Sequence, residues 1–273
     1  MGIFDRLFGT RGDQPPQAAA SATTTFDVVA SAPGSLDAVG GLDLPPGRPV
    51  VAEGGGVPIA WVTNQIGDHA DLWARLAGQF RDTGLWPVLA SGLDDGDLSR
   101  PWFDGELAGP DPEEPRDVLA FLTDASAGAA WVDAGEEDRD YRLRGLAAAT
   151  RSPGPVTITV PEGPRGLLLV PVTRPADVPR ALGWMGPANY DFGGSGQSTV
   201  LRSWEDRFGA VLVGMGFDVM QLVVAAPPTD PVQAELLARE HYAFCPDNVD
   251  QGVGSLEDYV PLVMGREWYF WWD

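Results

Sequence analysis

Short apolar runs alternate with amphipathic segments along this 273-residue chain, and this alternation limits the possible folds more than any other feature of the sequence. Residues 57–63 (VPIAWVT) and 85–90 (LWPVLA) are apolar runs of strand length, and residues 71–82 (DLWARLAGQFRD) between them have apolar side chains at helical spacing. A strand, a helix and a second strand in this order favour parallel pairing of the two strands through a right-handed crossover.

The same alternation continues to the end of the chain. Further strands are expected at residues 156–160, 167–172, 210–214, 218–225 and 267–273, and further helices at residues 116–123, 136–149, 176–184, 199–208, 231–244 and from residue 255 onward. Strands and helices that alternate throughout indicate an α/β or α+β fold, in which helices flank a mixed β-sheet.

Two of these helices have clear start signals. Asp230 stands at the N-cap position before Pro231, and Ser255 stands three residues before Asp258. Each helix therefore has a side-chain acceptor for the free amides of its first turn. Pro261 must end or kink the second of these helices, because a proline inside a helix removes a hydrogen bond.

A Ser-Pro-Gly-Pro segment at residues 152–155 marks a boundary between two similar-sized halves. We expect an N-terminal α/β domain over residues 26–150 and a C-terminal domain over residues 155–273. Each has a length that is usual for one domain.

Residues 1–25 form a short apolar hook and a linker rich in proline, alanine, threonine and glutamine. The apolar side chains of the hook share one face of a short helix: Ile3, Phe4, Leu7 and Phe8. Two interpretations stay open. The hook docks on a membrane surface, on a larger assembly or on the body of the same protein, or it is a frayed terminus, because so short a helix is marginal in water.

The chain has 39 acidic residues and 18 basic ones, a net charge of −21, and every basic residue is an arginine. So acidic a surface repels nucleic-acid phosphates and anionic lipids, which argues against nucleic-acid binding. Two explanations of the acidity remain. One is an anionic face that binds a basic protein partner, such as a toxin or a nuclease held inactive. The other is the compositional bias of a GC-rich coding sequence without lysine codons.

The sequence has no feature of a secreted or membrane-spanning protein. Residues 1–13 contain charged residues and no apolar core of a signal peptide. The longest apolar stretch, residues 210–226, is interrupted by Asp218 and Gln221 and is shorter than the ~20 residues that span a bilayer. The single cysteine, Cys245, excludes an internal disulfide framework. We therefore expect a cytoplasmic protein with no integral membrane association.

A glycine-rich turn at residues 193–199 (GGSGQST) leads into an expected helix. Free amides at a helix N-terminus attract anions, so Gly194, Gly196 and Ser198 are candidates for a weak anion site. A nucleotide-binding P-loop would also require a lysine, which this chain lacks. The alternative is a mobile loop in which Ser198 caps the helix.

Residues 240–252 (EHYAFCPDNVDQG) contain the strongest candidate site. Glu240 projects into the apolar face of the preceding helix, where a carboxylate must be paired, protonated or exposed to a pocket. His241 and Cys245 lie one helical turn apart, a spacing that suits two metal ligands or a thiolate–imidazole pair.

Asp247, Asp250 and Gln251 follow where the helix ends. The structural alternative for this segment is that Cys245 is a small buried apolar residue, His241 lies at the surface, and Asp247 caps backbone amides. We assign no catalytic residue, metal or cofactor from these residues.

The chain ends on the sequence WYFWWD at residues 268–273. On a strand, Tyr269 and Trp271 face one side, and the other three aromatic residues face the opposite side. Aromatic residues on both faces suit a central strand buried on both sides, and the wall of an aromatic pocket is the alternative. The carboxylates of Asp273 could pair with an arginine such as Arg207 or Arg239.

Four segments of the C-terminal part together resemble the bacterial domain-of-unknown-function 4253 family: residues 204–210 (WEDRFGA), 238–247 (AREHYAFCPD), 251–252 (QG) and 268–273 (WYFWWD). The resemblance extends from about residue 167 to residue 273. It implies a bacterial cytosolic protein with no established activity and gives no catalytic residues. It also implies that five residues form one constellation: Glu240, Cys245, Asp247, Gln251 and Asp273.

Two functional hypotheses follow. The first is a non-enzymatic, acidic module that binds a protein partner, with an immunity-type role against a basic toxin as one form of it. The second is an enzyme or small-ligand-binding protein. Its pocket would be built from Glu240, Asp247, Asp250 and the C-terminal aromatic strand, including Trp271.

Overall fold

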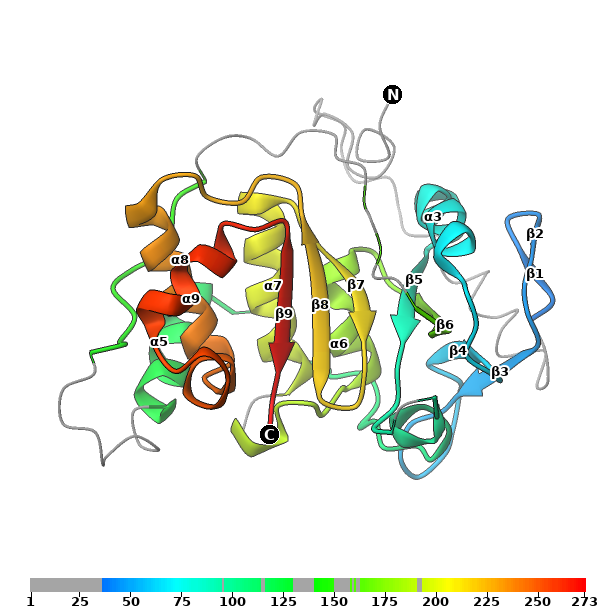
Figure 1. Ribbon diagram of the computed structural model, residues 1–273. Coiled ribbons are helices and arrows are strands. Elements are labelled where there is room, and N and C mark those ends of the chain that lie inside the picture. Colours follow the sequence, from blue (N-terminus) through cyan, green and yellow to red (C-terminus); the bar gives the residue numbers. More distant parts are fainter. Residues whose placement is uncertain are drawn as a thin grey trace, which may run out of the picture.

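The computed structural model describes residues 36–94, 96–113, 116–129, 140–149, 158, 160, 163–190 and 193–273. Its strands are β1 Ala38–Val39, β2 Leu42–Asp43, β3 Gly47–Val50, β4 Ala60–Thr63, β5 Leu85–Ala90, β6 Gly166–Pro171, β7 Ala210–Met215, β8 Val219–Val224 and β9 Glu267–Trp271 (Figure 1). Its α-helices are α3 Ala70–Gly78, α4 Phe80–Thr83, α5 Val118–Ala129, α6 Val178–Leu182, α7 Gly194–Phe208, α8 Pro231–Phe244 and α9 Leu256–Val263. Shorter helical turns are η1 Ser99–Phe103, η2 Pro175–Asp177, η3 Ala188–Tyr190 and η4 Asn248–Val253.

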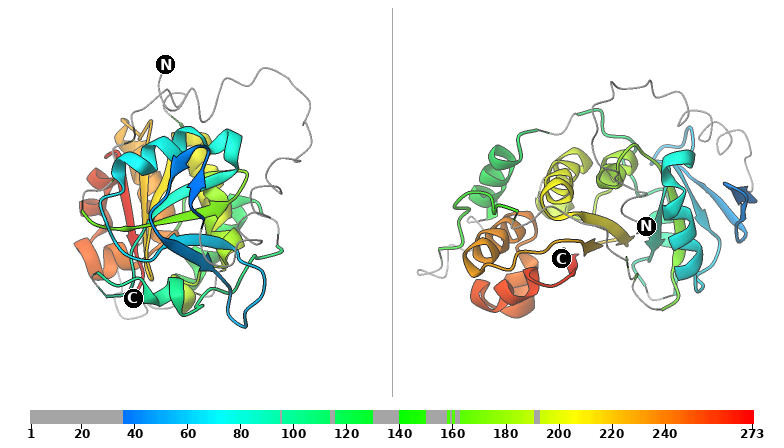
Figure 2. Two further views of the ribbon diagram at one scale, coloured as in Figure 1. Left: turned by 90° about the vertical axis from the view of Figure 1, so that its right-hand side faces the viewer. Right: turned by 90° about the horizontal axis from the view of Figure 1, so that it is seen from above.

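Strands β3 to β9 form one seven-stranded sheet in the order β3-β4-β6-β5-β7-β8-β9, and β1 and β2 form a separate hairpin. Neighbouring strands of the sheet are antiparallel except β5 and β7, which are parallel, with Leu89 opposite Gly214 and Ala90 opposite Met215. Helices flank the sheet (Figure 2). The expected α/β class with a mixed sheet is therefore confirmed.

The expected direct pairing of residues 57–63 with residues 85–90 is wrong. Strands β4 and β5 run in the same direction, because both are antiparallel to β6, but β6 lies between them. Every residue from Leu167 to Val170 in β6 is almost completely buried. This strand can therefore occupy a central position in the sheet. It lies between the two strands of the strand–helix–strand unit, β4 and β5.

Strands from both sides of the expected boundary at residues 152–155 share this sheet. Strand β6 from the C-terminal half lies between β4 and β5 from the N-terminal half. The boundary segment itself lies outside the described residues, as do residues 1–25 with the apolar hook. Of the strand expected at residues 156–160, only Ile158 and Val160 are described, and neither is in a strand.

Residues 140–149 are not helical, although a helix was expected over residues 136–149. Their backbone groups bind side chains of α8 instead. Ala147 N–H donates to Glu240 Oε1 at 2.7 Å, and Ala148 N–H donates to Gln233 Oε1 at 2.6 Å. Side chains that satisfy the backbone remove the advantage of a helix at this position. Residues 136–139 lie outside the described part.

Several helices differ from expectation at their ends. The helix expected over residues 116–123 is α5, Val118–Ala129, and the one expected over residues 176–184 is η2 followed by α6, which ends at Leu182. The helix expected over residues 71–82 is divided at Gln79 into α3 and α4. The helix expected to begin at Thr199 begins at Gly194, so the glycine-rich turn forms its first turns. Glycine at position 194 permits a close approach, because a Cβ atom there would lie 2.4 Å from the carbonyl oxygen of Pro179.

Strand β9 is an edge strand, not the central strand that aromatic residues on both faces had indicated. Trp268, Phe270 and Trp272 are buried, whereas Tyr269 on the other face is 49% exposed. The buried face packs on the aromatic residues of α7 and α8, including Trp204 and Phe244.

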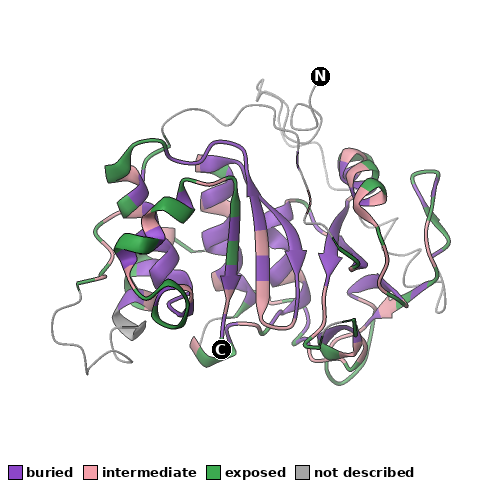
Figure 3. Ribbon diagram, viewed as in Figure 1, coloured by how far each residue is buried: buried purple, intermediate pink, exposed green. Residues whose placement is uncertain are grey.

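The start signals of α8 and α9 are confirmed. The Asp230 carboxylate accepts hydrogen bonds from the amides of Val232 and Gln233, and the Ser255 hydroxyl accepts one from the amide of Asp258. Pro261 lies inside α9 near its end. Buried residues are concentrated in the central strands and on the sides of α7 and α8 that face them (Figure 3). No helix among the described residues is both long and apolar enough to cross a bilayer.

Candidate functional site

The Glu240 carboxylate is completely buried and is paired with Arg207. Arg207 Nη2 lies 2.5 Å from Glu240 Oε2, and Arg207 Nη1 lies 2.8 Å from Oε1. Trp204 Nε1 also donates to Oε2 at 2.9 Å. Of the three environments expected for Glu240, the structure has the ion pair. With the amide of Ala147, four donors hold this carboxylate, so it connects α7, α8 and residues 140–149.

His241 is buried inside a group of aromatic rings, although a surface position was one expectation for it. The ring centres of Trp204 and Trp268 lie 4.6 Å from the centre of the imidazole. Its Nδ1 lies 3.2 Å from the hydroxyl of Tyr259, and its buried Nε2 has no partner among the described residues. Burial, and then the nearby charge of Arg207, lower the pKa of His241 well below 6.5. The imidazole is therefore neutral in the folded protein.

This buried imidazole makes stability depend on pH. Between its low folded-state pKa and an unfolded-state pKa of about 6.5, the unfolded chain binds a proton that the folded protein does not bind. The free energy of unfolding therefore falls as the pH drops below about 6.5, by up to ~1.4 kcal/mol per pH unit from this residue. Urea unfolding of wild type and His241→Phe over this pH range tests the effect. The difference between the two proteins should change below about pH 6.5 and be constant above it; parallel curves throughout would exclude His241 as the cause.

Cys245 and His241 bind different partners, so they do not form a thiolate–imidazole pair. The Cys245 thiol donates to the carbonyl oxygen of Trp271 at 2.9 Å, and burial raises the pKa of this thiol far above its ordinary value. The thiol is therefore protonated and structural, as the structural alternative had it. Within the described residues, no group of three or more His, Cys, Asp or Glu side chains is arranged to hold a metal ion.

Three side chains that follow α8 bind the outer edge of β9, and we call them the clasp: Cys245, Asp247 and Asn248. The Asn248 side chain accepts from Trp271 N–H at 3.1 Å and donates to the carbonyl oxygen of Tyr269 at 2.6 Å. Asp247 Oδ2 accepts from the amide of Asp273 at 3.0 Å. An edge strand presents unpaired backbone groups that can recruit another chain. The clasp satisfies these groups from Tyr269 O onward.

Asp247 is the centre of the clasp. It is buried, and its Oδ1 accepts from the hydroxyl of Tyr190 at 2.7 Å and from Gln251 Nε2 at 2.8 Å. Asp247, Gln251 and Asp273 are thus in direct contact, while Glu240 belongs to the separate Arg207 network. Asp250 is exposed, and its Oδ2 accepts from the hydroxyl of Tyr242 at 3.1 Å.

The expected pairing of Asp273 with Arg207 or Arg239 is wrong. Arg207 forms an ion pair with Glu240, and Arg239 forms one with Glu235 at 2.9 Å. Asp273 instead contributes its backbone, because its carbonyl oxygen accepts from Asn189 Nδ2 at 2.6 Å. The C-terminal residue is therefore held by hydrogen bonds from its own backbone and not by an arginine.

We predict that Asp247→Asn lowers the free energy of unfolding by about 1–3 kcal/mol. An amide has one acceptor oxygen, so it cannot accept from Tyr190, Gln251 and the Asp273 amide together, and one buried donor loses its partner. Asp250→Asn is the matched control, since its exposed side chain keeps an acceptor for Tyr242. Thermal and urea unfolding of the two variants measure the difference. Equal, small effects would show that the clasp does not stabilise the fold.

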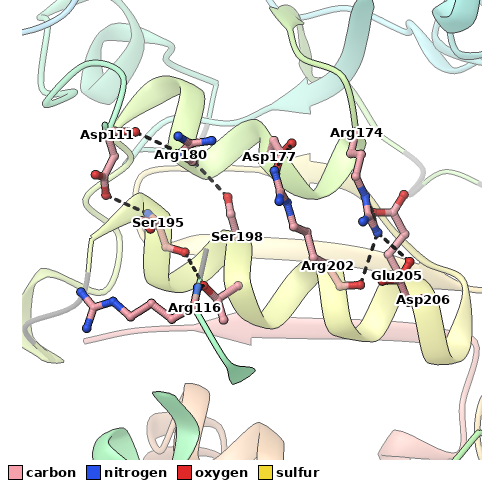
Figure 4. A network of polar contacts seen from close by, with 11 residues as sticks. Asp111, Arg116, Arg174, Asp177, Arg180, Ser195, Ser198, Arg202, Glu205 and Asp206 are labelled. Atoms are coloured by element: carbon pink, nitrogen blue, oxygen red, sulfur yellow. Dashed lines mark hydrogen bonds and ion pairs between the residues drawn. The ribbon is translucent and has the colours of Figure 1, made fainter. Parts of the chain in front are cut away.

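The candidate anion site is occupied by a carboxylate of the chain itself. Asp111 Oδ2 accepts from the amide of Ser195 at 2.9 Å, at the N-terminus of α7 (Figure 4). Ser198 does not cap the helix; its hydroxyl accepts from the amide of Arg180 at 3.3 Å. Gly194 and Gly196 lie within the first turns of α7. The glycine-rich segment therefore joins α7 to α6 and to the chain around Asp111.

Ion pairs continue this connection along α7 (Figure 4). Arg202 binds the Asp177 carboxylate through two nitrogens, at 2.6 and 2.8 Å. Arg174 binds Glu205 at 2.9 Å and Asp206 at 2.8 Å. Burial raises the pKa of Glu205 to about 7, although the Arg174 charge opposes the shift. These pairs fasten η2 and α6 to α7.

A groove of about 810 Å³ lies between α9 and β9, beside the clasp. Tyr259 and Trp268 line its buried side, and Val253, Leu262 and Tyr269 line its outer side. These last three side chains are 39%, 50% and 49% exposed. Met264, which follows the groove-lining Val263, is 36% exposed. Three of the exposed large apolar side chains therefore line one groove, while others, such as Val57 and Met185, lie elsewhere on the described surface.

The backbone of β9 is uncovered where it borders the groove. Strand residues alternate in the direction of their backbone groups, and Trp271 directs its N–H and C=O outward to the clasp. Glu267 and Tyr269 therefore also direct their backbone groups outward. No described residue hydrogen-bonds the amide of Tyr269 or the backbone groups of Glu267, whereas the clasp covers the rest of the edge.

The sequence did not indicate this groove, and it did not single out Asn248. The signal available for Asn248 was its position directly after the FCPD motif. For the groove, the signal was the pair of apolar residues Leu262 and Met264 near the end of a short helix.

The fold and site define an α/β protein whose C-terminal segment holds its own edge strand. Residues 166–273 match the model of a family described as "Domain of unknown function (DUF4253)", which confirms the resemblance of the C-terminal part. No curated protein gives a significant match to the chain. No solved structure gives one either.

Proposed function

We propose that this protein is a protein-binding module and that the groove between α9 and β9 receives its partner. One observation supports the proposal most: three exposed large apolar side chains, Val253, Leu262 and Tyr269, line the same groove. Isolated exposed apolar residues are common on protein surfaces, but a gathered apolar patch usually marks an interaction site.

The uncovered edge of β9 favours an extended segment as the occupant. A partner strand could form hydrogen bonds to the backbone groups of Glu267 and to the amide of Tyr269, which no clasp side chain covers. Alternate side chains of such a strand would then contact Leu262 and Tyr269. The clasp would limit pairing to this short part of the edge.

The acidity of the C-terminal segment favours a basic partner. From residue 247 to the end, the chain has one arginine, Arg266, and six acidic residues: Asp247, Asp250, Glu257, Asp258, Glu267 and Asp273. Of these, Arg266 and Glu267 line the groove itself. A surplus of acidic residues in the segment speeds the approach of a basic partner and disfavours acidic ones. A cytoplasmic protein with an immunity-type role against a basic toxin is one module of this kind.

An enzyme with a pocket built from Glu240, Asp247 and Asp250 has less support. The carboxylates of Glu240 and Asp247 already accept hydrogen bonds from several buried donors. A carboxylate so engaged is poorly suited to accept a proton from a substrate.

A designed peptide tests the proposal. A fluorescein-labelled peptide of alternating arginine and valine should bind the full-length protein saturably, and more weakly as salt is added. Leu262→Gln should weaken this binding at least about tenfold, because it removes apolar surface from the groove without changing the charge. Val232→Gln is the matched control: Val232 is 63% exposed on α8 and does not line the groove.

Fluorescence anisotropy measures both affinities, and a peptide with glutamate in place of each arginine tests the charge requirement. No saturable binding, or equal loss of affinity in the Leu262 and Val232 variants, would overturn the proposal.

A further inference from the structure

A second cavity, of about 240 Å³, lies where the parallel strands β5 and β7 end. It is lined by Ala90 and Ser91 at the end of β5, by Met215 at the end of β7, and by Tyr269 from β9. In open α/β sheets, ligands bind outside the carboxyl ends of parallel strands, where the chain departs to different sides. The cavity is smaller than the ~300–1,000 Å³ of pockets for drug-sized ligands, so its ligand is a small molecule.

The loop that closes this cavity is held in place by the chain itself. Ser91 N–H donates to the carbonyl oxygen of Met215 at 3.0 Å, and Trp102 Nε1 donates to Ser91 O at 2.7 Å. Gly92 allows the loop to fold tightly, because a Cβ atom there would lie 2.1 Å from Asp97 O. The wall is therefore formed before any ligand arrives, which reduces the entropy lost on binding.

Charged groups of both signs border the cavity without pairing with each other. Arg165 lies just before β6, and among the described residues its guanidinium donates only to the carbonyl oxygen of its neighbour Pro164, at 3.1 Å. The Asp94 carboxylate accepts no hydrogen bond from a described residue, and it acts electrostatically on Arg100, which does not line the cavity. The Asp218 carboxylate accepts one hydrogen bond, at 3.3 Å, from Trp271 Nε1. No ion pair among the described residues joins Arg165 to either aspartate.

The neutral polar groups of the cavity also have free hydrogen-bonding capacity. The side chains of Ser91 and Gln221 have no hydrogen bond to any other described side chain or backbone group, although both line the cavity. The half-exposed ring of Tyr269 forms part of the wall, and an aromatic face attracts a cation. Asp218 and Arg165 both act electrostatically on its hydroxyl, so these three groups lie close together.

We propose that this cavity binds a basic α-amino acid, that is, a molecule with one carboxylate and two cationic groups. Arg165 would bind the carboxylate, because a guanidinium matches its two oxygens. Asp94 and Asp218 would bind the cationic groups, with the ring of Tyr269 beside them. Two carboxylates, neither of them paired with the one arginine that lines the cavity, favour a ligand with net positive charge, which distinguishes a basic amino acid from an acidic or neutral one. The proposal does not depend on the function proposed for the groove.

Titration calorimetry of the full-length protein with L-arginine and L-lysine tests this site. We expect saturable binding of at least one of them below about 10 mM and no binding of L-glutamate. Arg165→Gln should weaken binding of the amino acid at least about tenfold but leave binding of putrescine, a diamine without a carboxylate, nearly unchanged. Asp218→Asn should weaken both ligands. Asp43→Asn is the control. It changes an exposed side chain on β2 that does not line the cavity, so it should alter the binding of neither ligand.

Two results would overturn the proposal. The first is no saturable heat with either amino acid up to about 10 mM, with wild type folded in the same buffer. The second is binding that Arg165→Gln and Asp218→Asn leave unchanged while both variants retain the wild-type melting temperature. Since the variants change partly exposed side chains, their melting temperatures separate a lost ligand site from a lost fold.

Discussion

Glu240→Ala should lower the free energy of unfolding by about 3–5 kcal/mol, because it leaves the Arg207 guanidinium in the interior without its counter-charge. The change also removes the acceptor of two further donors, Trp204 Nε1 and the amide of Ala147. A loss of this size would lower the melting temperature by roughly 6–20 °C in a domain of this size.

Urea unfolding of matched variants measures this loss. Glu257→Ala, on the exposed first turn of α9, should change the free energy of unfolding by less than about 1 kcal/mol. Replacing Glu240 and Arg207 together by methionine should be less destabilising than the sum of the single replacements, because no unpaired charge is left. Similar small losses for Glu240→Ala and Glu257→Ala would contradict the structural role of the pair.

Residues 166–273, the segment that matches the family, should not fold cooperatively when produced alone. Strand β6 does not pair with β7; β5, which is outside the segment, lies between them and pairs with both. Without β5, the wholly buried residues of β6 and β7 would be exposed to water. Strand β6 would lose both of its neighbouring strands and β7 one of its two, so less apolar burial is left to offset the entropy of ordering.

Circular dichroism and urea titration of this fragment test the prediction. We expect no cooperative transition for the fragment alone and recovery of a transition when residues 36–149, which contain β3, β4 and β5, are supplied as a second chain. A sharp unfolding transition of residues 166–273 by themselves would show that the family segment is an independent unit and that β5 is dispensable.

Local signals in the sequence predicted several elements well. Strand β5 and helix α8 have the bounds expected for them, because a continuous apolar run and an Asp-Pro start are signals within the segment itself. The cap of α9 by Ser255 was predictable for the same reason.

Interactions between distant residues decided what the sequence did not predict. Residues 140–149 have helical composition, yet side chains of α8 bind their amides, and no local pattern records a partner about 90 residues away. The position of β6 between β4 and β5 is also a long-range choice. The sequence indicated a core position for Trp271. Its role at the edge was not predictable, because it depends on Asn248 and Cys245, which follow α8 and bind β9.

In the candidate site, too, local signals were predictive and interactions between distant residues were not. A carboxylate at an apolar helix position had to find a partner, so the pairing of Glu240 was among the expected outcomes, but the identity of Arg207 was not predictable. Asp247, Gln251 and Asp273 were grouped through the family resemblance, and they are in contact. The groove was missed because it depends on how α9 lies against the uncovered part of β9.

Site-specific photo-crosslinking in cells that express the chain tests the central claim, that the groove between α9 and β9 binds a protein. A benzophenone amino acid would replace Leu262 in the groove or, as the control, Val232 on α8, which is exposed at least as much. We predict a discrete adduct from position 262 only, lost when the β9 edge is altered by Tyr269→Pro, and joined to a partner segment rich in arginine or lysine and aliphatic residues. The same adducts from both positions, or none from position 262 in cells where the protein is folded, would contradict the claim.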